Sequence, residues 1–313
     1  MKQKRKTSLW TKLYSLALTA FTVFVLLDTF IIPRAYVVES DDSTGSEQSA
    51  SAAVSTETDG GGTASSVASS VTENTYTDGN ISITITEYRE YDTSIYVADV
   101  TLTSPDYLKT AFADNTYGKN VTEKTSAIAQ ESGAVLAVNG DFYGAQNRGY
   151  VIRNGKIYRD TASGSSQEDL VIYEDGTFEI VTEGSVTAGE LLEKGAVQVL
   201  SFGPGLVENG EVSVTADEEV DKAKTSNPRT AIGVIDELHY VLVVSDGRTD
   251  ESTGLSLSQL AEFMQGLGVT TAYNLDGGGS STMVFNGTVI NNPTTDGNTI
   301  KERSVSDIVC IAY

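Results

Sequence analysis

Histidine and cysteine are almost absent from this chain, with one of each, His239 and Cys310, in 313 residues. A zinc site built from histidine and cysteine ligands needs several such side chains, so that class of metal centre is excluded. One cysteine cannot form a disulfide within the chain, and its apolar neighbours predict a buried strand residue. A Ser-His-Asp triad would need His239, which begins an apolar run and is better interpreted as a packed or surface strand residue.

Basic residues are also scarce, with 21 Lys and Arg against 43 Asp and Glu and a net charge of −22. The first 38 residues carry six basic residues and one acidic residue, so the rest of the chain has a net charge of about −27. We expect this acidic part to be soluble and not to bind nucleic acid, because phosphate contacts need clustered Lys and Arg. An anionic substrate would require locally gathered arginines.

Two common catalytic motifs are missing as well. No lysine follows the glycine-rich segment near the C-terminus, which excludes a phosphate-binding P-loop there. No G-x-S-x-G sequence is present, which argues against a hydrolase with a nucleophilic serine at a sharp strand-to-helix turn. The chemistry that remains uses carboxylates, arginines and backbone amides.

One long apolar run stands near the N-terminus. Residues 13–32 contain a single charge, Asp28 near the far end, and are long enough to cross a bilayer as a helix. The basic residues before it predict a cytoplasmic tail, residues 1–12, and an extracellular C-terminal part in a single-pass cell-membrane protein. A cleaved signal peptide is the alternative, but the run is long for one and no A-x-A site closes it.

Residues 33–75 are predicted to be a flexible linker, because Ser, Thr, Gly, Ala and acidic residues dominate and too little apolar surface is available for packing. Residues 76–313 are predicted to form one catalytic domain, which is long enough to bury a core without disulfides. The expected fold class is α+β: a strand-dominated mixed sheet domain with two main helices, preceded by one transmembrane helix.

Apolar and polar residues alternate in Ile81–Glu87 and Ile95–Thr103, which predicts half-buried strands. Helices are predicted at Lys119–Ser132 and Leu257–Leu267, the second with a capping box at Ser256. A short third helix should follow the capping box at Thr187. Further strands are predicted at Ala134–Val138, Leu170–Tyr173, Phe178–Thr182, Val197–Phe202, Ala231–Val234, His239–Ser245 and Val305–Ala312.

The glycine-rich segment reads Asp276-Gly277-Gly278-Gly279-Ser280, between two apolar strand-like runs. Glycines let the backbone approach a ligand closely, and consecutive amides can form an anion-binding concavity. A tight turn is the alternative, although one or two glycines would suffice for it. We therefore interpret the segment as a functional loop.

Four more polar clusters occur at expected strand ends. Three have a plain alternative, a turn for the Asn-Gly and Asp-Gly pairs and a surface salt bridge for Arg229. An arginine at the mouth of an apolar strand is also suited to a bidentate phosphate contact, and Asn-Gly-Asp followed by two aromatics could contact a sugar. Together the clusters favour a shared cleft. They are Asn139–Gly144, Asn227–Thr230, Ser245–Arg248 and Lys301–Ser304.

Six segments in this order resemble the phosphodiester glycosidase family. The resemblance extends from about Asn139 to Ala312 and implies an enzyme that hydrolyses a sugar-1-phosphodiester to free sugar and a phosphate monoester. A phosphodiester-linked glycan of the cell envelope or of exopolysaccharide is the expected substrate. The segments are Asn139-Gly140-Asp141-Phe142-Tyr143, Phe202-Gly203-Pro204-Gly205-Leu206, Pro228-Arg229-Thr230-Ala231-Ile232-Gly233, Asp246-Gly247-Arg248, Asn274–Ser280 and Glu302-Arg303.

The resemblance also implies roles for individual residues. Asp276 and Asp141 would be the leading catalytic carboxylates, with Asp246 as a substitute for Asp141, and Arg229 and Arg248 would grip the phosphate. Which carboxylate attacks is left open. The residues expected to orient sugar or phosphate are Asn139, Asn274, Gly277, Gly278, Gly279 and Ser280, with Arg303 as a supporting partner.

Two other functions stay open at this point, a non-catalytic surface module that binds anionic glycans and a transferase that uses the same cleft. No cofactor is required by the sequence. Carboxylates such as Asp276 and Asp246 could nevertheless hold Ca²⁺ or Mg²⁺, because both ions prefer oxygen ligands.

Overall fold

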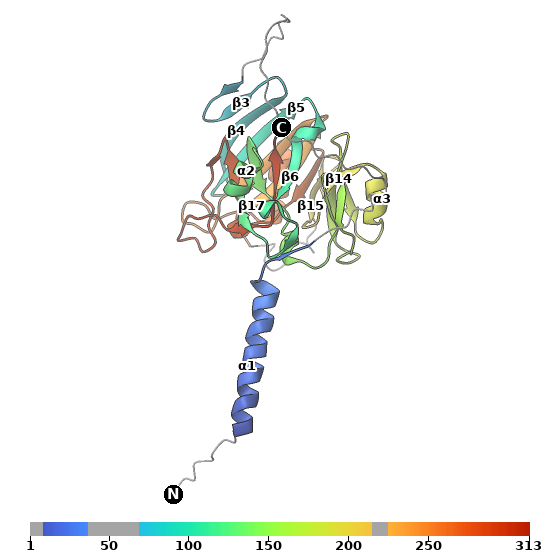
Figure 1. Ribbon diagram of the computed structural model, residues 1–313. Helices are drawn as coiled ribbons and strands as arrows, with labels where there is room; N and C mark the ends of the chain where they lie inside the picture. The colour runs from blue at the N-terminus through green and yellow to red at the C-terminus, as the bar shows by residue number, and fades with distance from the viewer. Residues whose placement is uncertain (1–8, 37–68, 215–224) are drawn as a thin grey trace, which may run out of the picture.

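The computed structural model describes residues 9–36, 69–214 and 225–313. Helix α1 (Leu9–Phe30) projects from one end of a β-rich domain, and the C-terminus lies at the opposite end (Figure 1). Within α1, Lys12–Thr29 has a mean hydropathy of 1.4 and no buried residue, so it is long and apolar enough to span a membrane or act as a signal sequence. Most of the predicted linker lies outside the described residues.

The largest sheet is antiparallel and has nine strands in the order β16-β15-β19-β17-β18-β5-β4-β3-β2. The alternation seen in the sequence is real: Ile81, Ile83 and Ile85 of β4 point into the core. The strands are β2 (Ser70–Val71), β3 (Thr75–Thr77), β4 (Ile81–Glu90), β5 (Thr93–Leu102), β15 (Gly205–Glu208), β16 (Glu211–Val212), β17 (Arg229–Asp236), β18 (His239–Ser245) and β19 (Thr271–Asn274).

A second sheet has the order β21-β20-β9-β23-β6. It contributes Leu136 and Val138 of β9 and Val309 of β23 to the same core as β4, and it holds the buried Cys310. Its strands are β6 (Leu108–Phe112), β9 (Leu136–Asn139), β20 (Met283–Phe285), β21 (Thr288–Val289) and β23 (Asp307–Ile311).

A third sheet, ordered β11-β10-β14-β12-β13, forms a side lobe with its own small core. Two short pairs complete the described strands: β1 (Arg34–Ala35) with β7 (Gly118–Lys119), and β8 (Glu123–Lys124) with β22 (Ser304–Val305). The strands of the lobe are β10 (Val151–Arg153), β11 (Lys156–Arg159), β12 (Glu168–Tyr173), β13 (Phe178–Thr182) and β14 (Ala196–Leu200).

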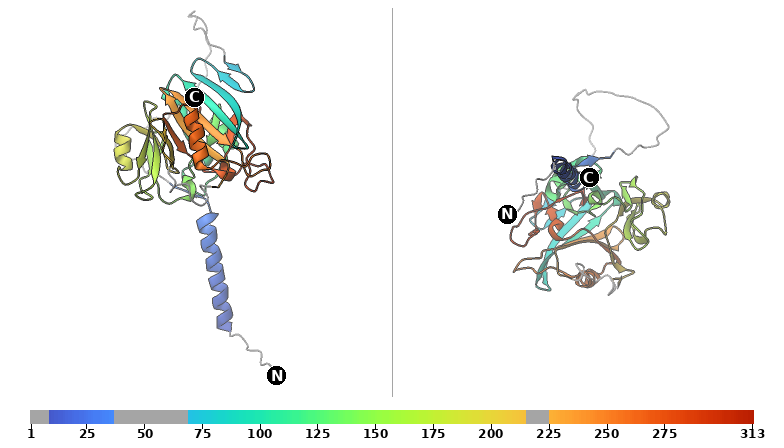
Figure 2. Two further views of the ribbon diagram at one scale, coloured as in Figure 1. Left: turned by 180° about the vertical axis from the view of Figure 1, so that it is seen from behind. Right: turned by 90° about the horizontal axis from the view of Figure 1, so that it is seen from below.

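Three helices pack on these sheets. Helix α4 (Leu257–Gly266), orange in Figure 2, buries Leu260, Ala261 and Met264 against the nine-stranded sheet. Helix α3 (Ala188–Glu193) covers the side lobe, and α2 (Thr125–Glu131) packs on β9 and β23. The predicted capping boxes at Ser256 and Thr187 are both present.

Two predicted elements differ from the structure. The helix expected from Lys119 begins only at Thr125, because the preceding residues pair as strands β7 and β8. The strand expected over Val305–Ala312 is split at Ser306: β22 pairs with β8, whereas β23 pairs with β6 and β9. In both places long-range pairing overrides the local pattern.

Antiparallel pairing brings several predicted site residues to one edge of the molecule. Arg229, the first residue of β17, pairs with Ser245 at the end of β18, and Ala231 pairs with Asn274 at the end of β19. The second sheet joins here, because the Thr230 hydroxyl donates a hydrogen bond of 2.8 Å to Oδ1 of Asn139. The loops that leave these strands therefore meet.

Candidate active site

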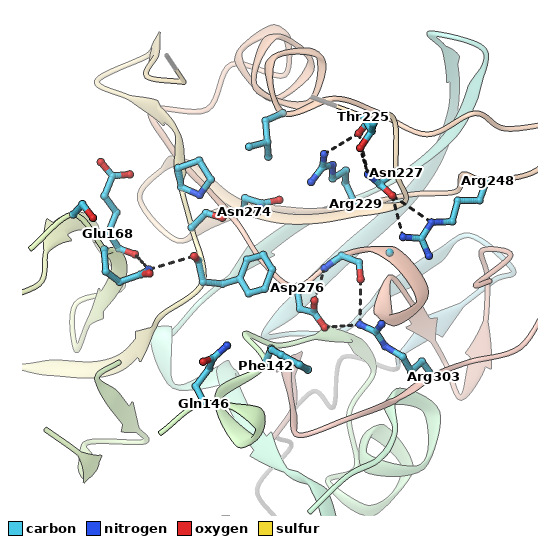
Figure 3. A pocket seen from close by; sticks show the side chains of 18 residues that line it. Phe142, Gln146, Glu168, Thr225, Asn227, Arg229, Arg248, Asn274, Asp276 and Arg303 are labelled. Atoms are coloured by element: carbon cyan, nitrogen blue, oxygen red, sulfur yellow. Dashed lines mark hydrogen bonds and ion pairs between the residues drawn. The ribbon is translucent and has the colours of Figure 1, made fainter. Parts of the chain in front are cut away.

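A cleft of about 840 Å³ opens where these loops meet (Figure 3). Seven of the predicted site residues line it: Arg229, Arg248, Asn274, Asp276, Gly277, Gly278 and Arg303. Residues outside the list of predicted site residues also line it, among them Phe142, Gln146, Glu168, Phe202, Asn227 and Leu257.

Asp276 is fixed at the centre of the cleft through both its backbone and its side chain. Its amide donates to the Gly140 carbonyl at 3.1 Å, and its carbonyl accepts from Nδ2 of Asn139 at 2.6 Å. Oδ1 accepts from the Gly277 amide at 2.9 Å, and Oδ2 lies 3.0 Å from Nη2 of Arg303. Burial raises the pKa of Asp276, while hydrogen bonding by Ser280 and the charge of Arg303 oppose that rise.

Two of the glycines after Asp276 could not be replaced without strain or a clash, because other groups lie close to where a Cβ atom would stand. Gly278 has φ +63°, and a Cβ there would lie 2.9 Å from Nη2 of Arg248. A Cβ on Gly279 would lie 2.2 Å from Oγ1 of Thr295. The loop is therefore a tight turn built against an arginine. Within this loop Gly279 and Ser280 are buried, and Ser280 Oγ accepts a hydrogen bond of 2.9 Å from Nε of Arg303.

Three arginines line the same cleft as the Asp276 carboxylate: Arg303, which contacts it, and Arg229 and Arg248. Arg229 is buried, and its Nε donates to the Leu255 carbonyl at 3.0 Å. Arg248 is exposed and donates from Nη1 to the Thr295 carbonyl at 2.8 Å and from Nη2 to Oδ1 of Asn227 at 3.0 Å. Those two acceptors are uncharged, so the positive charge of Arg248 is retained. Arginines fixed in this way suit an anion such as phosphate.

Asn274 and Asn139 have different positions relative to the cleft. Asn274 lines it and donates from Nδ2 to the Gly203 carbonyl at 2.7 Å. Its Oδ1 is buried and, within the described part of the chain, lacks a hydrogen-bond donor. A buried acceptor without a donor is costly. Asn139 lies behind Asp276 and holds the loop from below.

Asp141 is placed in the wall behind the cleft. Its Oδ2 lies 2.8 Å from Nη2 of Arg153 and accepts from the Ser201 amide at 2.8 Å. The same guanidinium contacts Asp307 at 2.8 Å, and all three side chains are buried. Burial raises the pKa of Asp307, with the Asp141 charge acting in the same direction. Asp141 does not line the cleft, and its catalytic role stays a prediction.

Asp246 lies in a smaller, separate cavity of about 320 Å³. Its Oδ1 accepts from the Asn292 amide at 2.8 Å, and burial raises its pKa. Asp246 and Asp276 therefore line different cavities. Across residues 9–36, 69–214 and 225–313, no three His, Cys, Asp or Glu side chains are grouped as metal ligands. Binding of Ca²⁺ or Mg²⁺, which the sequence left open, stays open.

Phe142 is one of the two aromatics that the sequence suggested for sugar contact, whereas Glu168 was not assigned a role. Phe142 adopts a left-handed backbone with φ +68° and leaves its side chain 38% exposed at the cleft, as expected for a surface on which a sugar can stack. Tyr143, the second aromatic of the motif, is buried instead. Glu168 lines the cleft on the side away from Arg248 and Arg303 (Figure 3), and its Oε2 accepts from the Gly205 amide at 2.8 Å. Nothing in the sequence marks this position, because Glu168 reaches the cleft only when β12 lies beside the Gly203–Gly205 segment in the folded chain.

Comparison with known proteins gives a consistent result. A family model for phosphodiester glycosidase (NAGPA) matches residues 132–312. The N-acetylglucosamine-1-phosphodiester alpha-N-acetylglucosaminidase of Mus musculus is 32% identical over 203 residues, which are 58% of this chain and 38% of the mouse protein. An uncharacterized SPbeta prophage-derived protein of Bacillus subtilis is 29% identical over 201 residues, which are 63% of this chain and 31% of that protein. The chain thus spans about a third of the length of these relatives.

Two solved structures share the fold. The catalytic domain of zebrafish N-acetylglucosamine-1-phosphodiester alpha-N-acetylglucosaminidase, auto-inhibited by its pro-peptide, superposes with a TM-score of 0.60 at 23% identity, covering 74% of this chain and 83% of that one. A hypothetical protein from Synechocystis superposes with a TM-score of 0.54 at 16% identity, covering 74% of this chain and 62% of that one. At these identities the likeness concerns the fold.

Proposed function

The chain belongs to the phosphodiester glycosidase family, and on that premise we propose that it hydrolyses a sugar-1-phosphodiester. Water adds its oxygen to the anomeric carbon, and the bond between that carbon and the phosphate oxygen breaks. The electron pair leaves with the phosphate, so the products are free sugar and a phosphate monoester. The observation that carries the proposal is Asp276 at the centre of a cleft lined by Arg229, Arg248 and Arg303.

The arginines explain how the reaction can proceed without histidine. A phosphate ester needs little protonation to leave, provided that its developing charge is stabilised. Arg229 and Arg248 line the cleft and are fixed by carbonyl and amide oxygens, so they can hold the phosphate before and after bond cleavage. A general acid at the leaving group is then dispensable.

Asp276 is the proposed catalytic carboxylate, acting on the anomeric carbon as nucleophile or through a water as base. Arg303 and the Gly277 amide favour its ionised form. Asn274 and the Phe142 ring, which line the cleft, would orient the sugar. Asp141 is proposed to position the segment that carries Phe142, because its Oδ1 accepts from the Tyr143 amide at 3.1 Å.

We further propose that α1 is retained as an anchor and that the domain acts outside the cell membrane on phosphodiester-linked sugars of envelope or exopolysaccharide material. The basic residues that precede α1 support this orientation.

The test uses the full chain in detergent with an N-acetylglucosamine-1-phospho-ester, and free sugar is recorded by mass spectrometry. We expect release by the parent and a loss of roughly 10²-fold or more in kcat for Asp276→Asn. Asp250→Asn, an exposed carboxylate outside the cleft lining, is the control and should retain activity. Retained turnover in Asp276→Asn would remove this carboxylate from the mechanism.

Other outcomes point to the alternative functions. Substrate binding without turnover by either protein would favour the anionic-glycan-binding module. Transfer of the sugar to a glycan acceptor in preference to water would favour the transferase.

A further inference from the structure

The segment after α1 is built into the domain. Strand β1 pairs with β7, with Arg34 opposite Lys119 and Ala35 opposite Gly118. The Tyr36 amide then donates to the Tyr117 carbonyl at 2.9 Å, and the two rings lie 5.7 Å apart. Residues 31–33 alone connect α1 to β1, and three residues reach at most about 10–11 Å. The domain is therefore held close to the end of α1.

The end of α1 also touches the domain directly. Nδ2 of Asn120 lies 3.2 Å from the Thr29 carbonyl and 3.3 Å from the Ile32 carbonyl, with hydrogen-bond geometry to both. Thr29 is the last residue of the span that is apolar enough to cross a membrane. If α1 spans a bilayer, Asn120 lies at the level of the lipid headgroups.

The same segment supports one wall of the cleft. The Asn120 amide donates to the Gly144 carbonyl at 3.0 Å, and Nζ of Lys119 donates to Oδ1 of Asn147 at 3.1 Å. Gly144 lies in the 3₁₀ turn Tyr143–Ala145, and the residues on either side of that turn, Phe142 and Gln146, line the cleft. Lys119 and Asn120, which lie next to the end of α1, are thus hydrogen-bonded to the segment that carries the cleft-lining residues Phe142 and Gln146.

From this connection we infer that the substrate is a membrane lipid: a sugar joined through a phosphodiester to an anchor embedded in the bilayer. The inference rests on the proposed function and names the substrate class of the same cleft. Because one wall of the cleft is hydrogen-bonded to Asn120, the cleft is kept near the headgroup region, where a lipid-borne phosphate lies. The lining also combines arginines with apolar side chains, Phe202 and Leu257, that suit the lipid side of such a phosphate.

Charge argues against a long polyanionic polymer as substrate. The chain carries −22, so a polymer with many phosphates is repelled along its whole length, whereas a lipid brings one phosphodiester to the arginines. In the proposed step, water oxygen bonds to the anomeric carbon and its proton passes to solvent. The lipid phosphate keeps the electron pair and stays in the bilayer as a monoester.

The experiment compares two substrates with the full chain reconstituted in phosphatidylcholine vesicles. One is an N-acetylglucosamine-1-phospho-ester of a long polyprenyl-like chain held in the vesicle, and the other is a short, water-soluble alkyl ester. We expect kcat/KM to be higher for the vesicle-held ester. A flexible spacer of about 20 Gly and Ser residues between Pro33 and Arg34 gives the domain a reach of roughly 25 Å and should lower that value about tenfold.

The matched control places the same spacer within residues 37–68, after β1, where it leaves the connection between α1 and the domain intact. This control should behave like the parent, and the short ester should be cleaved at equal rates by all three proteins, which shows that each is folded. The inference is overturned if the spacer between Pro33 and Arg34 lowers kcat/KM equally for both esters, or lowers it for neither. Failure of the parent to cleave either ester would instead reject the proposed function.

Discussion

The surroundings of Asp276 have two opposing effects on the pKa of its carboxyl group. The side chain is only 11% exposed, and loss of hydration raises its pKa above the ordinary value of 3.8. Arg303, whose side chain is 40% exposed, lowers the pKa, as do hydrogen bonds from Ser280 and the Gly277 amide. Burial is the largest of these effects, so the pKa is raised overall, and perturbed pKa values are common for groups that take part in a reaction.

The raised pKa of Asp276 predicts the pH dependence of the proposed hydrolysis. Because the ionised form of Asp276 acts, kcat/KM should fall as pH drops through its raised pKa. Arg303→Gln removes a cation that favours ionisation, so the pKa should rise further and the acid limb should move to higher pH. Arg303→Lys keeps the charge and should move the limb less. If the parent and both variants have the same pH–rate profile, the acid limb does not report the ionisation of Asp276.

Arg153 joins three elements that are distant in the sequence. It ends β10 of the side lobe and contacts Asp141, just after β9, and Asp307, the first residue of β23. Its Nη1 also donates to the Ile152 carbonyl at 3.1 Å. The guanidinium therefore fastens the side lobe to the second sheet behind the cleft wall.

We expect Arg153→Met to lower the free energy of unfolding by about 3–5 kcal/mol, because it leaves two buried carboxylates without their cation. Denaturant unfolding of the full chain in detergent measures this. Arg148→Met is the control: Arg148 is exposed and bonds the Ala162 carbonyl at 3.4 Å, so its replacement should cost under about 0.5 kcal/mol. Similar costs for both variants would show that the buried ion group does not stabilise the fold.

Elements with a local signal were predictable, and elements set by distant partners were not. Alternating or apolar residues predicted the limits of β13 and β18, and the spacing of polar residues predicted both capping boxes. All of these signals lie within a few residues of one another in the sequence. Strand β6 escaped prediction, because Leu108–Phe112 is a strand only through its pairing with β23. Another distant pairing, that of β8 with β22, displaced the start of α2.

The site shows the same division. The Asp276 loop and the arginines stood out because glycines and charges at strand ends are visible in the sequence, and the cleft brings them together. The sequence could not distinguish Asp141 from Asp276, since both follow apolar strands. Their difference arises from Arg153 and Asp307, which surround Asp141 in the folded chain.

At the scale of the whole molecule, the charge of −22 is a source of self-repulsion in the compact state. We expect the thermal midpoint of the full chain to rise by a few degrees when NaCl increases from about 20 to 500 mM at neutral pH, because salt screens exposed charges. Differential scanning fluorimetry measures it. An uncharged osmolyte at matched osmolarity is the control, and an equal rise in that osmolyte would assign the effect to solvent exclusion instead.

Cys310 lies within β23, where burial raises the pKa of its thiol to about 12. The thiolate that reacts with alkylating reagents is therefore scarce, and the side chain is covered. Since the sequence contains no other cysteine, a cysteine introduced at the surface, for example by Gln146→Cys at the cleft rim, would be the preferred attachment point for a maleimide dye or a spin label. The natural chain thus serves as its own background for distance measurements between the cleft and a bilayer.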